Sequence, residues 1–296
     1  MATPGHAPQT APLAFPALLL GAAALAVGPV FVRTADVSPI ASAFYRMALA
    51  APVLVALALA TGQQWPARRS GGVLAFAGVL FAVDIAAWHL GIVRTTLGNA
   101  VLFGNVSSFF FAGYGFWLAR AWPTRRFGAA MVVAAVGVTL LLGRSFELSA
   151  AHFTGDLLCV AAAIAYTAYL AVMDKARASV GAILALAVAT VVGAVALAPF
   201  AVAMPGHFVP HHWTPLILLA FGSQVFGQGL VIYAVGHLKP AVSGLGLLIQ
   251  PVIAAAIGWA WFGEAMGAVD ALGAVLVLGS LAAARWPGRK ATLRRF

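Results

Sequence analysis

The chain has 296 residues, of which 63% are hydrophobic and only 8% charged, and its mean hydropathy is +1.00. A soluble globular domain carries roughly 25% charged residues, so this composition excludes an ordinary soluble enzyme. The net charge of +10 at pH 7 suits either nucleic-acid binding or cytoplasmic anchoring of a membrane protein. Because most basic residues stand between or just after apolar segments, we favour membrane anchoring and expect no nucleic-acid partner.

Ten apolar segments follow one another along the chain, each close to the roughly 20 residues that a transmembrane helix requires. The first five span residues 14–32, 39–60, 71–92, 97–118 and 127–143. The second five span residues 155–173, 181–203, 214–235, 240–261 and 267–284. Runs of this length exclude strands of a soluble sheet, and the alternation of a transmembrane β-barrel is missing. The sequence therefore predicts an all-α polytopic membrane protein with ten transmembrane helices.

The segment before the first predicted helix contains no Lys or Arg between Met1 and Pro12. The charged region of a signal peptide is therefore missing, and we expect the first apolar segment to be retained as a span. Cys159 is the only cysteine, which excludes an intramolecular disulfide.

The orientation in the membrane follows from the Lys and Arg residues outside the spans. Thirteen of the 17 fall on one predicted side: Arg68, Arg69, Arg120, Arg125, Arg126, Lys175, Arg177, Lys239, Arg285, Arg289, Lys290, Arg294 and Arg295. The opposite side holds Arg33, Arg94 and Arg144, and Arg46 lies within the second segment. Cytoplasmic loops carry the excess of positive charge, so we expect both termini in the cytoplasm, with tails at 1–13 and 285–296.

Four tryptophans fall at segment ends, as interfacial anchors do: Trp65, Trp122, Trp213 and Trp286.

The two halves of the chain contain an internal repeat. Residues 88–137 align without gaps on residues 233–282. The matched pairs include Trp88 with Tyr233, Arg94 with Lys239, Asn105 with Gln250, and Gly128 with Gly273. General likeness among membrane helices is the alternative, but the coincidence of polar and glycine positions argues against it. Five spans per half force the second half to enter the membrane from the other side. We therefore predict two inverted five-helix repeats, at 14–143 and 155–284, an arrangement typical of secondary transporters.

Three short motifs stand in order along the predicted helices. The second segment contains Pro39 followed by Tyr45 and Arg46, and the sixth contains Gly155-Asp156-Leu157-Leu158 followed by Ala165-Tyr166-Thr167-Ala168-Tyr169. The ninth contains Gln250-Pro251 followed by Phe262-Gly263-Glu264. With these motifs the chain resembles, over essentially its whole length, the drug/metabolite transporter superfamily and specifically its ten-helix EamA-type exporters. The first segment departs from that pattern, because Leu20-Gly21 stands near the place of the family's Trp-Gly pair. The resemblance implies export of small metabolites, including aromatic amino acids, across a bacterial inner membrane.

Charged residues inside the spans are the first candidates for a substrate site. A charge at membrane depth costs at least roughly 2.5–3.5 kcal/mol on insertion scales, so it normally faces the bundle interior or a water-filled cavity. Asp84 lies in the middle of the third segment and shares a helical face with Trp88. We expect Asp84 either to bind a substrate ammonium or carry a proton, or to pair with Arg46. His89 follows directly, and an imidazole that titrates near neutral pH suits proton coupling.

Asn99 and Tyr166 are further candidates in the fourth and sixth segments. Asn99 is expected either to line a cavity or to hydrogen-bond to another helix. Tyr166 belongs to one helical stripe, which consists of Cys159, Ala162, Tyr166, Tyr169 and Met173. A phenol in hydrocarbon requires a hydrogen-bond partner, so this stripe is expected to face inward, where Tyr166 either packs in the core or lines the cavity.

Two glutamines complete the candidate substrate-binding set. Gln228 follows Gln224 by one helical turn, and such amides either bind the carboxylate of a zwitterion or join neighbouring helices. Gln250 precedes Pro251. The missing N–H of a proline frees an upstream carbonyl, which can line a cavity.

Residues in the connections are expected to be structural. Glu264 and Asp270 bracket the last connection, where we expect capping. His207, His211 and His212 lie in a connection without cysteine or carboxylate, so we expect no metal site.

We therefore predict a secondary exporter working by alternating access through a central cavity, and the resemblance implies amino acids, aromatic or bulky apolar, as its substrates. Efflux of drugs or other metabolites is the main alternative, and an intramembrane enzyme on a lipid-linked substrate and a passive channel are two further ones. A phosphate-binding Gly-x-x-x-x-Gly-Lys loop and protease or hydrolase motifs are absent from the sequence. We therefore expect no enzyme activity and no cofactor, with a small-molecule substrate and the lipid bilayer as partners of a monomer.

Overall fold

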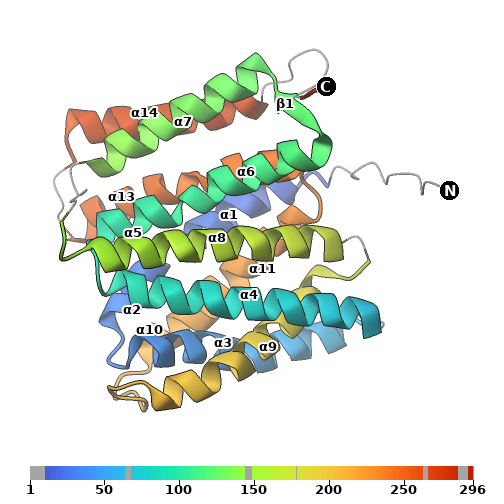
Figure 1. The fold of residues 1–296 in the computed structure, drawn as a ribbon, viewed down its shortest axis with the longest axis vertical. Helices are drawn as coiled ribbons and strands as arrows, with labels where there is room; N and C mark the ends of the chain where they lie inside the picture. Colours follow the sequence, from blue (N-terminus) through green and yellow to red (C-terminus); the bar gives the residue numbers. More distant parts are fainter. Residues whose placement is uncertain are drawn as a thin grey trace.

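The computed structural model describes residues 11–63, 68–143, 149–177, 179–262, 266–285 and 293–295. Nine helical spans in this part of the chain are long and apolar enough to cross a membrane, and a shorter apolar helix covers Ala268–Ala283. Six spans are single helices: α3 (Pro39–Ala60), α4 (Arg68–Ile92), α7 (Arg125–Gly143), α8 (Phe153–Ala176), α9 (Ala182–Ala203) and α14 (Ala268–Arg285). The prediction of an all-α, ten-helix membrane protein is confirmed (Figure 1).

The other four spans are interrupted. They consist of α1 (Ala14–Ala26) with α2 (Gly28–Thr34), α5 (Leu97–Gly104) with α6 (Val106–Ala119), α10 (Thr214–Leu218) with the π-helix η1 (Leu219–Gly227) and α11 (Gln228–Val235), and α12 (Pro240–Leu247) with α13 (Ile249–Phe262). Two short strands, β1 (Ala121–Pro123) and β2 (Leu293–Arg295), pair antiparallel. The predicted tails lie largely outside the described residues, as do Trp65, Trp286 and Glu264.

The packing of the helices follows a two-fold pattern. The third span, α4, packs on the sixth span, α8. In the equivalent pair, the eighth span (η1 and α11) packs on the first span (α1). Likewise α5 and α6 pack on α8, and α12 and α13 pack on α1. The second, fourth and fifth spans pack on their own counterparts, in the pairs α3–α9, α6–α12 and α7–α14. The bundle is therefore built from two inverted five-helix repeats.

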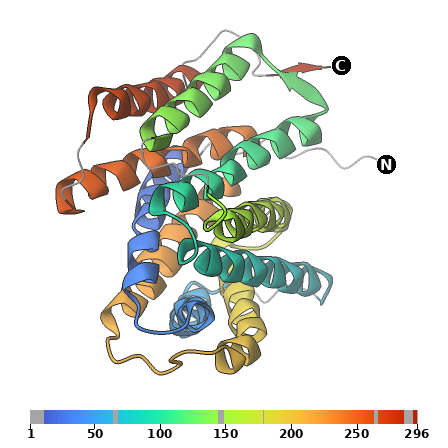
Figure 2. The ribbon, with the colours of Figure 1, turned by 60° about the vertical axis from the view of Figure 1, so that its left-hand side comes forward.

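The helix pairs form successive layers. Figure 1 shows α7 and α14 together at one edge and α3 and α9 at the other, with α1, α4, α8 and α11 between them, and Figure 2 shows the same order after a turn. At the first edge, a Cβ built on Gly137 would lie 2.8 Å from the carbonyl oxygen of Gly273, and one on Gly273 would lie 2.6 Å from that of Gly137. Only glycine permits such close backbone contact between membrane helices.

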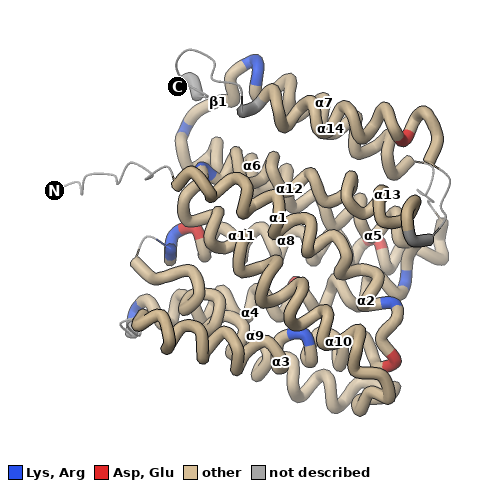
Figure 3. The backbone as a smooth tube through the Cα atoms, turned by 180° about the vertical axis from the view of Figure 1, so that it is seen from behind, with Lys and Arg blue, Asp and Glu red and all other residues tan. Residues whose placement is uncertain are grey.

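The bundle has two ends, which differ in charge. We call the end where α1 begins and α14 ends the terminal end, and the opposite one the far end. In Figure 3 most of the coloured Lys and Arg residues gather at the terminal end. Arg33 stands in the last turn of α2 and Arg94 follows α4, both at the far end, whereas Arg46 lies within α3.

Large apolar side chains cover the outside of the bundle. Val195 is 69% exposed, Phe200 66% and Phe76 57%. Such a surface requires hydrocarbon rather than water as solvent. Phe81, Phe111 and Tyr169 are fully buried, so the interior still contains a packed core.

Candidate functional site

A cavity lies at the centre of the bundle, between the two repeats. Its volume of about 90 Å³ holds several water molecules, since one water needs about 10–15 Å³. Five of the seven predicted site residues line it: Asp84 and Trp88 of α4, Tyr166 of α8, Gln228 of α11 and Gln250 of α13. These side chains come from both halves of the chain, and their contact with substrate stays a prediction.

Interrupted helices surround this cavity. Pro29 stands at the start of α2, and Pro251 follows the break at Leu248 between α12 and α13. A proline has no N–H to donate to the carbonyl four residues earlier, so the ninth span breaks where Leu247 would have been the acceptor. Asn105 separates α5 from α6, and its amide donates to the carbonyl of Val101 at 2.8 Å. The breaks therefore place polar backbone and side-chain groups at the depth of the cavity.

The cavity wall contains one carboxylate and one guanidinium. Arg46 of α3 is 3% exposed and Asp84 is 7% exposed, and both line the cavity. Arg46 Nε donates to Gln224 Oε1 at 3.1 Å, and Gln224 Nε2 donates to Thr190 Oγ1 at 3.0 Å. Asp84 has no hydrogen bond to the described residues and forms no ion pair within 4.0 Å with them, although the charge of Arg46 acts on it. The expected close pairing of Asp84 with Arg46 is thus not formed, and the carboxylate stays available to a ligand.

Aromatic rings form another part of the site. Phe81 stacks on Tyr169 with ring centroids 4.3 Å apart, and Tyr166 lies 5.9 Å from Tyr169. The hydroxyl of Tyr166 donates to Gln228 Oε1 at 3.2 Å. Phe81, Tyr166 and Trp88 reach the cavity, while Tyr169 is fully buried beside it. The predicted inward stripe of α8 is confirmed, because its other members are buried as well.

The structure places the remaining two predicted residues outside the cavity. His89 is fully buried and faces the backbone of Pro39, but its ring nitrogens form no hydrogen bond of good geometry. Asn99 is also fully buried, and its amide donates to Asp156 at 3.0 and 3.2 Å. The hydroxyl of Thr95 donates to the same carboxylate at 2.5 Å. Asn99 therefore joins α5 to α8, which is the interhelical alternative of its prediction.

Arg46 and Gln224 contribute to the site beyond the seven residues that the sequence predicts. The motif from Pro39 to Arg46 marks the position of Arg46, for which the sequence predicts only a pairing with Asp84. Gln224 lies in the π-helix η1, a form that recurs at functional sites. Its local sequence contains no signal for the contact with Arg46, because that contact joins residues 178 positions apart.

At the far end, one loop is tied across the two halves. We call residues 204–213 the far-end strap. Its His207 carbonyl accepts from the Ser38 N–H at 2.9 Å, and the N–H groups of His211 and His212 donate to Asp36 Oδ2 at 2.8 and 3.1 Å. Desolvation raises the pKa of Asp36, but these backbone hydrogen bonds outweigh it, so the pKa lies below its ordinary value. The strap therefore depends on an ionised Asp36.

Two arginine side chains at the ends of spans also donate hydrogen bonds to backbone carbonyls. Arg33 at the end of α2 donates to the carbonyls of Ile92 and Thr95 at 3.0 and 2.7 Å. Arg177 after α8 donates to the carbonyl of Ile232 in α11 at 3.4 Å. These two arginines occupy related places in the two repeats, at opposite ends of the bundle.

Comparison with known proteins agrees with this architecture. The model of the EamA-like transporter family matches residues 13–143 and again 153–285. An uncharacterized transporter of Archaeoglobus fulgidus is 25% identical over 254 residues, which cover 82% of this chain and 86% of that protein. A solved structure, described only as the crystal structure of a protein, is similar with a TM-score of 0.76 over 96% of this chain and 100% of that chain. At 17% sequence identity, this likeness shows the fold alone. The chain is therefore a multi-pass membrane protein that belongs to the EamA-like transporter family of the drug/metabolite transporter superfamily.

Proposed function

We propose that this transporter exports amino acids with aromatic or bulky apolar side chains, by alternating access through the central cavity. The observation that carries the proposal is the pairing of opposite charges with aromatic rings in one buried space. Asp84 and Arg46 line the same cavity as Trp88, Phe81 and Tyr166.

The two charges suit a zwitterion. Asp84 is free to accept from an ammonium group, while Gln224 holds Nε of Arg46 and leaves its terminal NH₂ groups for a carboxylate. Charge-assisted hydrogen bonds of this kind are roughly twice as strong as neutral ones. A zwitterion satisfies both charges at once, whereas a lone cation or anion leaves one of them buried and unpaired, which is costly.

The rings and amides suit the rest of an amino acid. Trp88, Phe81 and Tyr166 offer aromatic faces to an apolar side chain. Gln228 and Gln250 supply amide groups to the polar end. A drug with a permanent cation would use Asp84 and the rings but not Arg46.

The packing of the fourth and ninth spans supports alternating access. Their segments near the terminal end, α6 and α12, pack closely together, whereas α5 packs on α8 and α13 packs on α1 and α7. A Cβ built on Gly244 of α12 would lie 2.4 Å from the carbonyl oxygen of Ser108 in α6. The cavity therefore lies between this tight contact and the far end. In the opposite state of the transport cycle, in which the two repeats exchange conformations, the contact would open.

The charge distribution supports an orientation for export. Because the terminal end carries most of the Lys and Arg residues, we place it and both termini in the cytoplasm of a bacterial inner membrane. In this orientation the closed contact between α6 and α12 faces the cytoplasm.

A counterflow assay in proteoliposomes tests the amino-acid assignment. Exchange of radiolabelled phenylalanine should saturate, and unlabelled phenylalanine should compete. Phenethylamine, which lacks the carboxylate, and phenylpropionate, which lacks the ammonium, should compete at least tenfold less well, since one charge-assisted hydrogen bond contributes about 1.5–3 kcal/mol. Equal competition by phenethylamine would instead favour efflux of cationic drugs.

Substitution of the Asp84 carboxylate tests whether this residue binds the substrate, and the same substitution at Asp174 is the control. Asp84→Asn should raise the half-saturating phenylalanine concentration about tenfold or more, by loss of a charged hydrogen bond. Asp174→Asn makes the same chemical change in α8 outside the cavity lining and should leave that concentration unchanged. If both variants behaved alike, Asp84 would not bind the substrate ammonium.

A further inference from the structure

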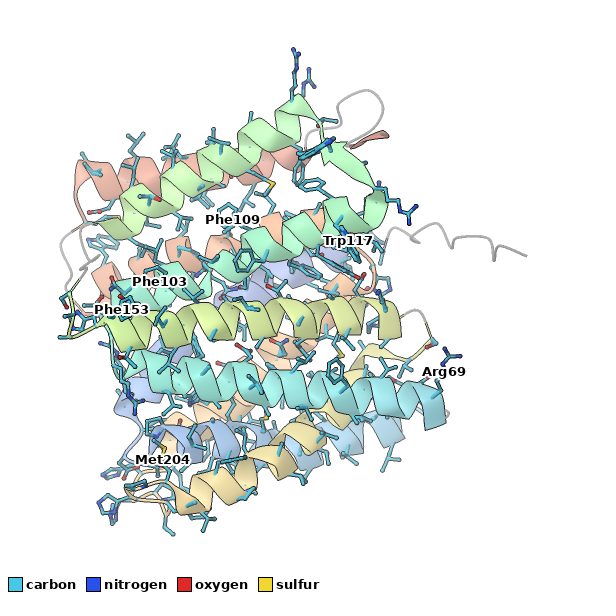
Figure 4. All side chains as sticks on the ribbon, in the orientation of Figure 1. Arg69, Phe103, Phe109, Trp117, Phe153 and Met204 are labelled. Atoms are coloured by element: carbon cyan, nitrogen blue, oxygen red, sulfur yellow. The ribbon has the colours of Figure 1, made fainter. Side chains whose placement is uncertain are left out.

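A groove separate from the central cavity opens on the outside of the bundle at the terminal end. It has a volume of about 740 Å³ and lies between α6, β1 and α7. Phe116, Trp117, Trp122 and Met131 provide most of its apolar wall. Trp117 is 72% exposed and Trp122 68% exposed, and tryptophans with this exposure are typical of the membrane–water interface. Figure 4 labels Trp117 on α6 near β1.

One cation stands at the end of this groove. Arg120 lines it together with the two tryptophans, and its lining contains no Asp or Glu. Within the described ranges, the guanidinium of Arg120 has no hydrogen-bond or ion-pair partner. The pairing of β1 with β2 sets Trp122 opposite Arg294 and Ala121 opposite Arg295 in the backbone register. The groove is therefore apolar along its length and cationic at its interfacial end.

The backbone at Arg120 is unfavourable for any side chain. Its φ of 45° is left-handed, and it is the one non-glycine residue with positive φ in the part of the chain that the structure describes. Helices commonly end on such a residue, and glycine is the usual choice because it has no Cβ. An arginine here carries a backbone cost that glycine would avoid, and residues strained in this way often lie at ligand-binding sites.

The groove has empty space beside α6. A Cβ built on Gly113, which lines the groove, would meet nothing within 4 Å. A large apolar side chain at this position would therefore fill the groove without disturbing the packing of the protein.

We propose that this groove binds one anionic phospholipid, with an acyl chain along Gly113, Trp117 and Met131 and the phosphate at Arg120. The shape supports a lipid, because the groove runs from the interface into the apolar belt. The charge supports an anionic headgroup, because a phosphate forms strong charge-assisted hydrogen bonds with a guanidinium. The site is independent of the substrate cavity and of the proposed substrate.

The test uses the purified full chain in a non-ionic detergent. Added phosphatidylglycerol should raise the thermal unfolding temperature more than phosphatidylcholine does, and native mass spectrometry should detect one retained phosphatidylglycerol. Arg120→Gly and Gly113→Leu should each weaken that binding at least tenfold, whereas Arg120→Lys should retain it. Arg69→Gln removes a charge from the same end of the bundle (Figure 4) but lies outside the groove lining, and it should bind like the wild type.

Arg120→Gly also separates lipid binding from folding. Because glycine relieves the left-handed backbone, this variant without lipid should unfold at the same temperature as the wild type or higher. The proposal is overturned if Arg120→Gly binds phosphatidylglycerol as the wild type does, or if soluble glycerol phosphate stabilises the protein equally. It is also overturned if Gly113→Leu leaves lipid binding intact but changes the oligomeric state, which would assign the groove to a second copy of the chain.

Discussion

Asp84 and Asp156 are two buried carboxylates with opposite surroundings. Asp84 is open to the cavity and has no hydrogen-bond partner among the described residues. Asp156 accepts hydrogen bonds from Thr95 and Asn99, so it joins the start of the fourth span to the sixth. A carboxylate without protein partners is available to a ligand, whereas one with its acceptors occupied holds helices together. In the sequence Asp84 stands in the middle of an apolar segment and Asp156 at the start of one, and neither position alone shows which carboxylate has protein partners.

Removal of the Asp156 carboxylate should destabilise the protein without changing substrate affinity. Asp156→Ala leaves the donors of Thr95 and Asn99 unpaired, and we expect the free energy of unfolding to fall by about 1.5–3 kcal/mol. Denaturant unfolding of the purified protein measures this loss, and counterflow measures the half-saturating concentration. Asp174→Ala, a carboxylate for which no such hydrogen bonds are formed in the described chain, serves as the control. A large rise in the half-saturating concentration of Asp156→Ala would contradict a structural role.

At the scale of elements, interrupted helices and one tied loop shape the transport path. The breaks beside Pro29 and Pro251 follow from the missing proline N–H. The break at Asn105 and the π-helix η1 have no proline inside them, and tertiary contacts such as that of Gln224 with Arg46 accompany them. The far-end strap joins the connection after the seventh span to the connection before the second span, through its hydrogen bonds with Asp36 and Ser38.

The strap should respond to acid only at low pH. The pKa of Asp36 is lowered in the folded state, so its contribution to stability is fully present above the unfolded pKa of about 3.9 and is lost as the pH falls through the still lower folded pKa. We expect the amides of His211 and His212 to stay protected from hydrogen exchange between pH 5 and 8. Asp36→Ala should remove that protection across this whole range, with the amides of α9 as an internal control. Loss of protection in the wild type near pH 6 would show that Asp36 does not control the strap.

At the scale of the whole molecule, the two inverted repeats form equivalent helix pairs, but the two halves of the fourth and ninth spans pack differently. The pairs α4–α8 and α1–α11 are equivalent, yet α6 and α12 are in contact while α5 and α13 pack on other helices. Gly244 makes this contact possible, because a Cβ there would also lie 2.6 Å from the backbone nitrogen of Ala112. Under the proposed alternating access, the contact between α6 and α12 is the part of the fold that a change of state would break.

A bulky residue at Gly244 should force this contact apart. Gly244→Leu is expected to lower the free energy of unfolding by about 1–3 kcal/mol, as overpacking does. It should also make a cysteine at Ser108, introduced with Cys159→Ala, react faster with an impermeant maleimide. Gly279→Leu is the matched control, because a Cβ there meets nothing within 4 Å. Unchanged reactivity at position 108 would show that the contact between α6 and α12 does not close the path.

The sequence by itself determined the membrane class, the ten spans, the inverted halves and five of the polar and aromatic residues that line the cavity. Hydropathy, odd span number and polar positions are local properties of the chain, so they can be read without coordinates. Only the tertiary structure decided that Asn99 binds Asp156, that His89 lies outside the cavity, and that Gln224 holds Arg46 beside Asp84. Those outcomes depend on which helices cross and how each is rotated about its axis, and contacts between residues far apart in the chain set both.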